Sequence, residues 1–207
     1  MRTIVRRRRL TRDEAQARTR DDLLNAARAL IAAKGLSGAS VRDIAEAAGY
    51  TQGAFYSNFS RKEDILIELL RRHMGDALAE LEALLDQARR APERGWSLFK
   101  TWLEANPPDD DWTVIELELQ LHASRNPDFA RDCDALYVGK RQALGEIVAG
   151  VFALLGKPPP APPETIAAGA IALSQGLAAM RRPGKPDPAL GEAMSLYFRA
   201  LLGIEDG

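Results

Sequence analysis

SVRDIAEAAGYTQGAFYSNFSRKED, residues 40–64 of a 207-residue chain, is the stretch that decides the fold. Its pattern predicts a short helix over about 40–48 and a second over about 52–58. Ala45 is small enough to let two helices cross closely. Gly49 can adopt the left-handed conformation that ends a helix. The stretch therefore predicts a helix-turn-helix, in which a short second helix is held at a fixed angle and stays partly exposed.

Helical periodicity continues on both sides of this stretch. Apolar residues at helical spacing predict a first helix over about 18–34, which Gly35 ends. Ser60 and Glu63 have the spacing of a capping box, which predicts a long helix over about 61–90. No strand pattern appears, so the sequence predicts an all-α fold of about nine helices. Further helices are expected over about 93–105, 109–125, 127–155, 164–181 and 188–202, with prolines between them.

The composition is that of an ordinary globular protein, with 46% apolar and 28% charged residues. No apolar run approaches the ~18 residues of a membrane span, and no secretory signal follows the first residues. Cys133 is the only cysteine and there are two histidines, so an internal disulfide and a Cys- or His-rich metal site are excluded. We expect no cofactor, no metal, no membrane partner and a cytoplasmic location.

The charge is divided unevenly along the chain. Residues 1–62 hold 13 Lys/Arg and 6 Asp/Glu, a net of +7, whereas residues 63–207 hold 15 and 23, a net of −8. Such asymmetry indicates a polyanionic partner for the first part, the alternative being a solvated surface with a loose arginine tail. We predict a basic flexible arm over 1–17, a DNA-binding domain over 18–62, and an effector-binding and dimerisation domain over 63–207.

Residues 20–70 resemble the TetR family of bacterial transcriptional regulators. The resemblance rests on a first helix ending in AAKG and on a GxFYxxF-SxKExL run formed by Gly53, Phe55, Tyr56, Phe59, Ser60, Lys62, Glu63 and Leu66. It implies a homodimer whose two heads bind adjacent major grooves of a palindromic operator. It also implies repression that a small ligand in the C-terminal domain relieves. Residues 71–207 carry no motif that names a family.

The family's DNA-contacting positions on the second helix of the motif have suitable side chains here. Gln52 can hold an adenine edge with two hydrogen bonds, and Gly53 lets the helix sit deep in the groove. Tyr56 offers a hydroxyl to a phosphate, or alternatively packs between helices. The full set of candidate DNA contacts is Ser40, Arg42, Thr51, Gln52, Gly53, Tyr56, Asn58 and Lys62.

Four of these candidates carry their own alternatives. Arg42 could reach a base or a phosphate, whereas Ser40 is equally well explained as a helix cap. Lys62 is a cation near a helix N-terminus, where the dipole disfavours it, so we predict a phosphate contact rather than a structural role. Asn58 stands where relatives commonly have histidine, and its amide can still bond a phosphate.

Aromatic and soft side chains are concentrated in the middle of the chain and predict an effector pocket between helices. A flat or lipophilic effector would suit it, with His122 or Glu116 orienting the ligand. The alternative is an ordinary core, and a lone cysteine on such a stripe is usually inert packing. The candidates are Trp96, Phe99, Trp102, Trp112, Ile115, Glu116, Leu119, His122, Phe129, Cys133 and Tyr137.

The last two helices predict the dimer interface. The first of them is rich in alanine and glycine, which would let helices of two subunits approach closely and form a four-helix bundle. The alternative is ordinary packing within one chain. The predicted interface residues are Leu173, Leu177, Met180, Leu190, Met194 and Phe198.

We therefore predict a ligand-responsive repressor that binds double-stranded operator DNA. A transcriptional activator and an architectural DNA-binding protein are the alternatives among DNA-binding proteins. An all-α enzyme is a remote alternative, because no nucleophile–base motif, phosphate loop or metal-spaced cluster occurs in the sequence.

Overall fold

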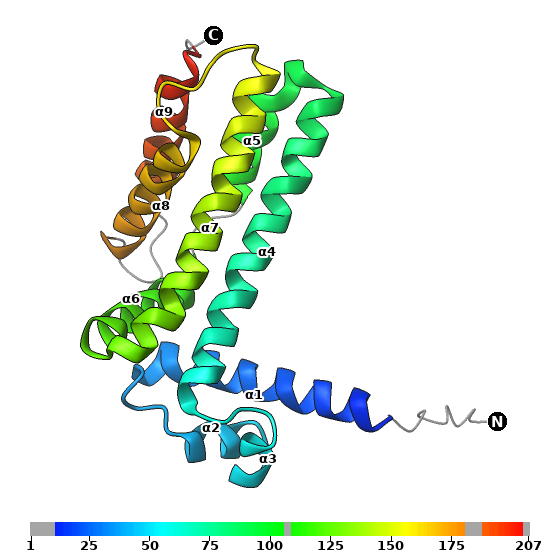
Figure 1. Cartoon of the computed structure of the whole chain (residues 1–207), viewed down its shortest axis with the longest axis vertical. Helices are drawn as coiled ribbons and strands as arrows, with labels where there is room; N and C mark the ends of the chain where they lie inside the picture. Colours follow the sequence, from blue (N-terminus) through cyan, green and yellow to red (C-terminus); the bar gives the residue numbers. More distant parts are fainter. Residues whose placement is uncertain (1–10, 106–108, 181–187, 205–207) are drawn as a thin grey trace, which may run out of the picture. The chain divides into compact units, whose positions relative to one another are not determined.

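The computed structural model describes residues 11–105, 109–180 and 188–204, and within these ranges the chain forms nine α-helices, one short 3₁₀ turn and no strand (Figure 1). This confirms the predicted all-α fold. The helices are α1 (Arg12–Lys34), α2 (Val41–Ala47), α3 (Gln52–Tyr56), α4 (Lys62–Arg90), α5 (Gly95–Ala105), α6 (Asp110–Arg125), α7 (Pro127–Leu154), α8 (Pro163–Met180) and α9 (Pro188–Leu202), with the 3₁₀ turn at Pro92–Arg94. No helix in the described ranges is long and apolar enough to cross a membrane.

The chain divides into two compact units after Leu69, not after residue 62 as predicted. The difference arises because α4 begins within the first unit. Its first two turns contribute Ile65 and Leu66, which are 0% and 1% exposed. Burial of these apolar side chains binds the start of α4 to the first unit, whereas sequence periodicity marks only where the helix begins.

The first unit, called the head below, is a small group of helices with buried apolar side chains on α1, α2 and α3. Leu23, Ala27 and Ile31 recur at helical spacing along α1 and are fully buried. Ile44 from α2 and Phe55 from α3 are fully buried as well. Short helices such as α2 and α3 are marginal alone, so this shared core holds them in place.

α1 begins six residues earlier than predicted. Thr11 and Glu14 form a capping box, in which Glu14 accepts from the Thr11 N–H at 2.8 Å and Thr11 accepts from the Glu14 N–H at 3.2 Å. Each bond satisfies an amide that the helix itself leaves unpaired. Residues 12–17 of the predicted flexible arm are therefore helical, and residues 1–10 lie outside the described part of the chain.

α4 is also capped one residue later than predicted. The Asp64 side chain accepts from the Arg61 N–H at 2.9 Å, and its other oxygen pairs with the Arg61 guanidinium at 2.9 Å. The observed cap is thus a single bond, because the Arg61 side chain has no acceptor that could complete a reciprocal capping box. It uses Asp64 in place of the predicted Glu63, and the sequence offered two acidic residues in succession for this role.

In the second unit the long helices α4 and α7 run side by side, and α8 and α9 pack against α7 and α5 (Figure 1). Two glycines on α7 allow close contacts with neighbouring helices, one with α4 and one with α8. A Cβ on Gly150 would lie 2.8 Å from Leu85 of α4, and one on Gly145 would lie 3.1–3.3 Å from Glu164 at the start of α8. The contacts at Gly145 include backbone atoms, so a side chain there would have to displace α8.

Gly145→Val is expected to destabilise the protein by about 1–3 kcal/mol, because the branched side chain overpacks the crossing of α7 and α8. The measurement is urea unfolding followed by tryptophan fluorescence, since all three tryptophans lie in the second unit. The matched control is Gly139→Val on the same helix, where an added Cβ meets nothing within 4 Å. Equal stability of the two variants would contradict the close crossing.

Candidate nucleic-acid interface

α3 has one buried and one exposed side. Phe55 is fully buried, whereas Thr51, Gln52 and Gly53 are exposed and the Tyr56 ring is 56% exposed. Thr51 also caps the helix, because its hydroxyl accepts from the Ala54 N–H at 3.3 Å. The structure therefore brings four of the predicted DNA contacts onto one outward surface. Tyr56 has features of both predicted roles, because more than half of the residue is exposed and its ring packs edge to face on Phe55 at a centroid distance of 5.5 Å.

α1 holds α3 at both ends. On the N-terminal side, the Tyr50 hydroxyl donates to Asp22 at 2.9 Å. On the C-terminal side, Arg20 donates to the carbonyl of Asn58 at 2.9 Å and its guanidinium lies 4.2 Å from the centre of the Phe59 ring. The same guanidinium lies 3.5 Å from the Glu68 carboxylate on α4. Sequence analysis missed Arg20 and Asp22, because neither belongs to a pattern that marks a tertiary partner.

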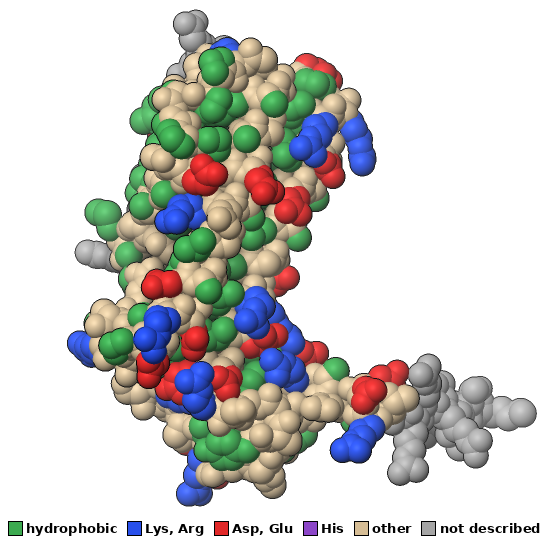
Figure 2. All heavy atoms as spheres, in the orientation of Figure 1, with side chains coloured by type: hydrophobic (Ala, Val, Ile, Leu, Met, Phe, Trp, Pro, Cys, Tyr) green, Lys and Arg blue, Asp and Glu red, His purple; other side chains and the backbone are tan. Residues whose placement is uncertain are grey.

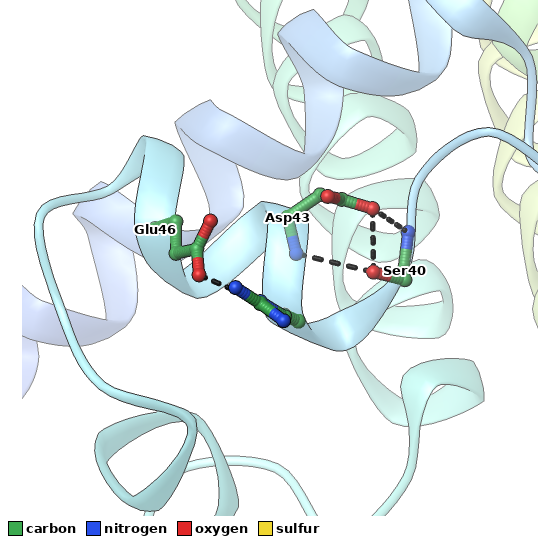
Figure 3. A network of polar contacts seen from close by, with 4 residues as sticks. Ser40, Asp43 and Glu46 are labelled. Atoms are coloured by element: carbon green, nitrogen blue, oxygen red, sulfur yellow. Dashed lines mark hydrogen bonds and ion pairs between the residues drawn. The ribbon is translucent and has the colours of Figure 1, made fainter.

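Ser40 and Arg42 lie at the start of α2, and Figure 3 shows their surroundings. Ser40 and Asp43 form a reciprocal capping box, whose hydrogen bonds to the Asp43 carboxylate lower the pKa of that group. Ser40 thus has the capping role that the sequence left as its alternative. The Arg42 side chain is exposed and pairs with Glu46 at 2.7 Å, and that hydrogen bond raises the Arg42 pKa. DNA contact by Arg42 would have to compete with Glu46.

Lys62 has a structural partner, contrary to the sequence prediction. Its ammonium group donates to the carbonyl of Leu36 at 2.6 Å, which ties α4 to the loop between α1 and α2. Lys62 is half-buried, and burial lowers its pKa. Lys62 therefore has a structural role, since the Leu36 carbonyl accepts a hydrogen bond from its ammonium group, and the phosphate contact stays a prediction.

Asn58 is likewise engaged within its own unit. Its side-chain amide donates to the carbonyl of Ala54 at 2.8 Å, and the residue is half-buried. This bond extends the capping of the short helix α3 at its C-terminal end. The geometry supports a role in ending α3 and gives no support to the predicted phosphate contact.

The predicted effector residues form two separate groups, of which the first lies on α6 and α7. Ile115, Leu119, Phe129 and Cys133 are at most 3% exposed, so they are core residues. The His122 ring meets the Phe129 ring edge to face at 4.9 Å. Trp112, at the other end of α6, stacks at 4.0 Å on His73 of α4. Most of the predicted effector residues on α6 and α7 are therefore ordinary core residues, which was the alternative to a pocket.

Polar members of this group meet between α6, α7 and α8. Glu116 accepts from Gln175 at 3.4 Å and lies 4.0 Å from the Lys140 ammonium, with both charged side chains about 15% exposed. Burial, then the neighbouring Glu116 carboxylate, raises the pKa of Tyr137 to about 12. Its phenol therefore stays protonated at neutral pH and can act as a hydrogen-bond donor.

A shallow depression opens beside this polar group. Its empty volume is about 200 Å³ including open space, below the ~300–1,000 Å³ of typical ligand pockets. Glu116 is the one predicted pocket residue in its lining, which consists of Thr113, Glu116, Leu117, Gln120, Gln175 and Ala178.

The second group is the aromatic cluster of α5. Phe99 contacts Trp96 at 5.9 Å and Trp102 at 6.1 Å, and meets Phe198 of α9 edge to face at 5.0 Å. Trp96 also packs against the buried cluster of Phe152, Ile166 and Leu202. Phe198 was predicted at the dimer interface, but the structure places it in contact with α5 of its own chain.

The small residues of α8 serve contacts within the chain. Ala167 and Ala178 are 1% and 9% exposed. A Cβ on Gly169 would lie 2.6 Å from the hydroxyl of Tyr197 on α9, which donates to the carbonyl of Ile166 at 3.1 Å. At Gly169 the absence of a side chain allows α8 to approach α9 of the same chain, and the close approach of a second subunit stays a prediction.

Other predicted interface residues remain accessible. Met180 is 83% exposed, and Leu173, Leu177 and Met194 are partly exposed. The side chain of Leu190 lies outside the described residues. Leu196, which the sequence did not single out, is 59% exposed on α9.

Cys133 is expected to be unreactive in the folded protein. The side chain is 3% exposed, and burial raises its pKa to about 11. Because the thiolate is the reactive form, reaction with a disulfide reagent at pH 8 should be roughly 100-fold slower in native protein than in urea. A stopped-flow absorbance assay measures both rates, with Cys133→Ala as the blank. Similar rates in the two conditions would show that the thiol is accessible.

Comparison with known proteins agrees with this geometry. The family described as "Bacterial regulatory proteins, tetR family" matches residues 23–69, which contain α2 and α3 and parts of α1 and α4. The HTH-type transcriptional repressor KstR2 of Mycobacterium tuberculosis is 37% identical over 111 residues, which cover 54% of this chain and 56% of the repressor. The chain thus spans about half the length of the curated relatives it matches.

Solved structures share the fold of the chain as a whole. A TetR-family regulator from Mesorhizobium loti superposes with a TM-score of 0.73 at 19% identity, covering 94% of this chain and 98% of its own. FadR from Bacillus subtilis, solved in complex with stearoyl-CoA, superposes with a TM-score of 0.69 at 20% identity, covering 89% and 99%. The matched family model and the curated relatives describe transcriptional regulators, in agreement with the prediction that the chain is not an enzyme. An outward-facing α3 in a capped helix-turn-helix and a sequence match over the same residues lead to one conclusion: residues 23–69 form an N-terminal domain of the TetR family of bacterial regulatory proteins.

Proposed function

We propose that this protein is a homodimeric repressor that binds a palindromic operator and is released from it by a small effector. The observation that carries the proposal is α3, whose Gln52, Gly53 and Tyr56 face outward while Phe55 anchors the helix in the core. Such a helix can enter the major groove and present an amide to base edges. A regulator of this kind works on chromosomal DNA, so we also propose a cytoplasmic location.

The two units would have different roles. The first unit, with the DNA-binding domain predicted over 18–62, would read the operator. The second would bind the effector and the partner subunit. The partner subunit would bind on α8 and α9, where Met180 and Leu196 offer exposed apolar side chains.

The effector we propose is small and lipophilic or aromatic. The apolar lining of α6 and α7 supports this class, and the FadR complex shows that the shared fold can hold a lipophilic ligand. Glu116, Tyr137 and Lys140 would supply the few polar contacts that orient a ligand. The depression beside them is small, so the effector would have to widen it, and widening is a means by which binding could be coupled to DNA release.

Selection of DNA from a random-sequence duplex pool tests the proposal. Wild-type protein is expected to enrich a short palindrome bound at least about tenfold more tightly than a scrambled duplex. Gln52→Ala should lower that preference, because a lost bidentate base contact costs about 1–3 kcal/mol. The matched control is Gln87→Ala, an exposed amide on α4 in the second unit. Failure to enrich any sequence would refute the proposed function.

A further inference from the structure

The guanidinium of Arg20, on α1, holds three groups of the head at once. One terminal nitrogen donates to the Asn58 carbonyl at 2.9 Å, and the other lies 3.5 Å from the Glu68 carboxylate on α4. The central carbon lies 4.2 Å from the centre of the Phe59 ring. The Arg20 and Glu68 side chains are 33% and 15% exposed, so partial shielding from water strengthens these contacts. A planar guanidinium that meets three partners is held in one orientation.

Two of the three partners lie in the segment that joins α3 to α4. Residues 57–61 separate these helices, and Asn58 and Phe59 belong to this connection. The Phe59 residue is 3% exposed, which anchors the connection in the core. α3 itself is five residues long and has little stability alone, so its orientation depends on the chain that flanks it. Arg20 therefore contributes directly to the angle at which α3 lies on the head.

The described part of the head has little net charge with which to attract DNA. Residues 11–69 hold eight Lys/Arg and nine Asp/Glu, a net charge of −1. On the face drawn in Figure 2, acidic and basic side chains lie interspersed. Hydrogen bonds to base edges need donor–acceptor distances of about 2.7–3.2 Å and weaken steeply when they are misaligned. With so little electrostatic attraction, preference for a sequence depends on accurate placement of α3 against the bases.

We propose that Arg20 is a positioning residue for sequence recognition, which holds α3 at the angle that lets Gln52 meet a base edge. This inference rests on the proposed function. Arg20 acts through Asn58, Phe59 and Glu68, with no contact of its own to DNA. The competing role is a direct contact between the guanidinium and a backbone phosphate, which arginine commonly makes. A phosphate would compete with the Glu68 carboxylate for the same guanidinium, so the two roles predict opposite effects when the Glu68 charge is removed.

The test measures the affinity of full-length variants for the selected palindrome and for a scrambled duplex at several salt concentrations. Arg20→Gln is expected to lower the preference for the palindrome by about 5- to 100-fold, the range for loss of one base contact. Its binding to the scrambled duplex should stay within about threefold of wild type, with an unchanged salt slope. Arg20→Lys should also lose preference, because one ammonium group cannot hold three partners as the planar fork does.

Glu68→Gln separates the two roles of Arg20 at nearly constant side-chain size. Positioning predicts that this variant loses preference by about 2- to 10-fold, because the guanidinium loses one of its partners. A phosphate-binding Arg20 would instead be released, and both duplexes would bind more tightly. The double variant should lose no more preference than Arg20→Gln alone. The matched control is Arg12→Gln, which removes the same charge from an exposed position on α1 and should leave the preference unchanged.

Thermal unfolding followed by circular dichroism gives a temperature at which the compared variants are fully folded, and binding is measured there. An unchanged preference in Arg20→Gln, or in Glu68→Gln if the first variant does not fold, would overturn the inference. An equal loss on both duplexes, with a salt slope lower by about 0.9, would also overturn it and identify a phosphate contact. A wild-type protein that selects no palindrome would instead refute the proposed function.

Discussion

Gly53→Ala is expected to weaken operator binding by about 10- to 100-fold without destabilising the protein. An alanine Cβ at this position meets only the Thr51 hydroxyl, at an ordinary 3.6 Å, so the free protein has room for it. Alanine also favours a helix over glycine by about 1 kcal/mol. The loss of affinity would arise on the DNA side, because the methyl group would stand between α3 and the floor of the groove.

The measurement pairs a binding titration on the selected palindrome with a thermal unfolding curve. Gly75→Ala is the matched control, since Gly75 is exposed on α4 and an added Cβ there meets nothing within 4 Å. Both variants should be at least as stable as wild type, and only Gly53→Ala should lose affinity. If Gly53→Ala bound as tightly as Gly75→Ala, close approach of α3 to DNA would be excluded.

Phe55→Ala is expected to destabilise the first unit by about 3–5 kcal/mol, the usual effect of removing a large buried aromatic side chain. The Phe55 ring is fully buried and contacts the rings of Tyr56 and Phe59. Because α3 is only five residues long, it has little stability apart from this anchor. DNA binding should be lost together with the folded head.

Two spectroscopic signals separate the units in this experiment. Trp96, Trp102 and Trp112 all lie in the second unit, whereas helices of both units contribute to circular dichroism. On heating Phe55→Ala, the first unit should unfold first, and part of the ellipticity should be lost at that point. The tryptophan fluorescence, which reports the second unit, should change only at a higher temperature. The neighbouring variant Tyr56→Ala is the control, since its ring is 56% exposed and its removal should change stability little. Similar unfolding of the two variants would refute the role of Phe55.

Features that depend on nearby residues were predictable from the sequence. The helices of the motif, the caps at Ser40 and Thr51, and the exposure of Gln52 and Gly53 follow from periodicity and capping chemistry within a few residues. The all-α fold follows from the same local rules. Recognition of the family added the expected role of α3.

Features that depend on distant partners were not predictable. The dipole at the start of α4 disfavours a cation, but a carbonyl 26 residues away provides a partner for Lys62. Phe198 has the spacing of an interface residue, and only the fold shows that its ring packs against Phe99 of the same chain. The charge count over residues 1–62 was correct, yet it could not show how many of the cations were already paired.

The two attachments of α3 to α1 determine how the head can respond to a force. Asp22 and Arg20 lie two residues apart on one rigid helix and hold the two ends of α3, so they restrain its tilt as well as its position. In the proposed repressor, a motion of α1 would therefore carry α3 with it. Such a motion would change the position of α3 on DNA, while the side chains that α3 presents to the bases would stay the same.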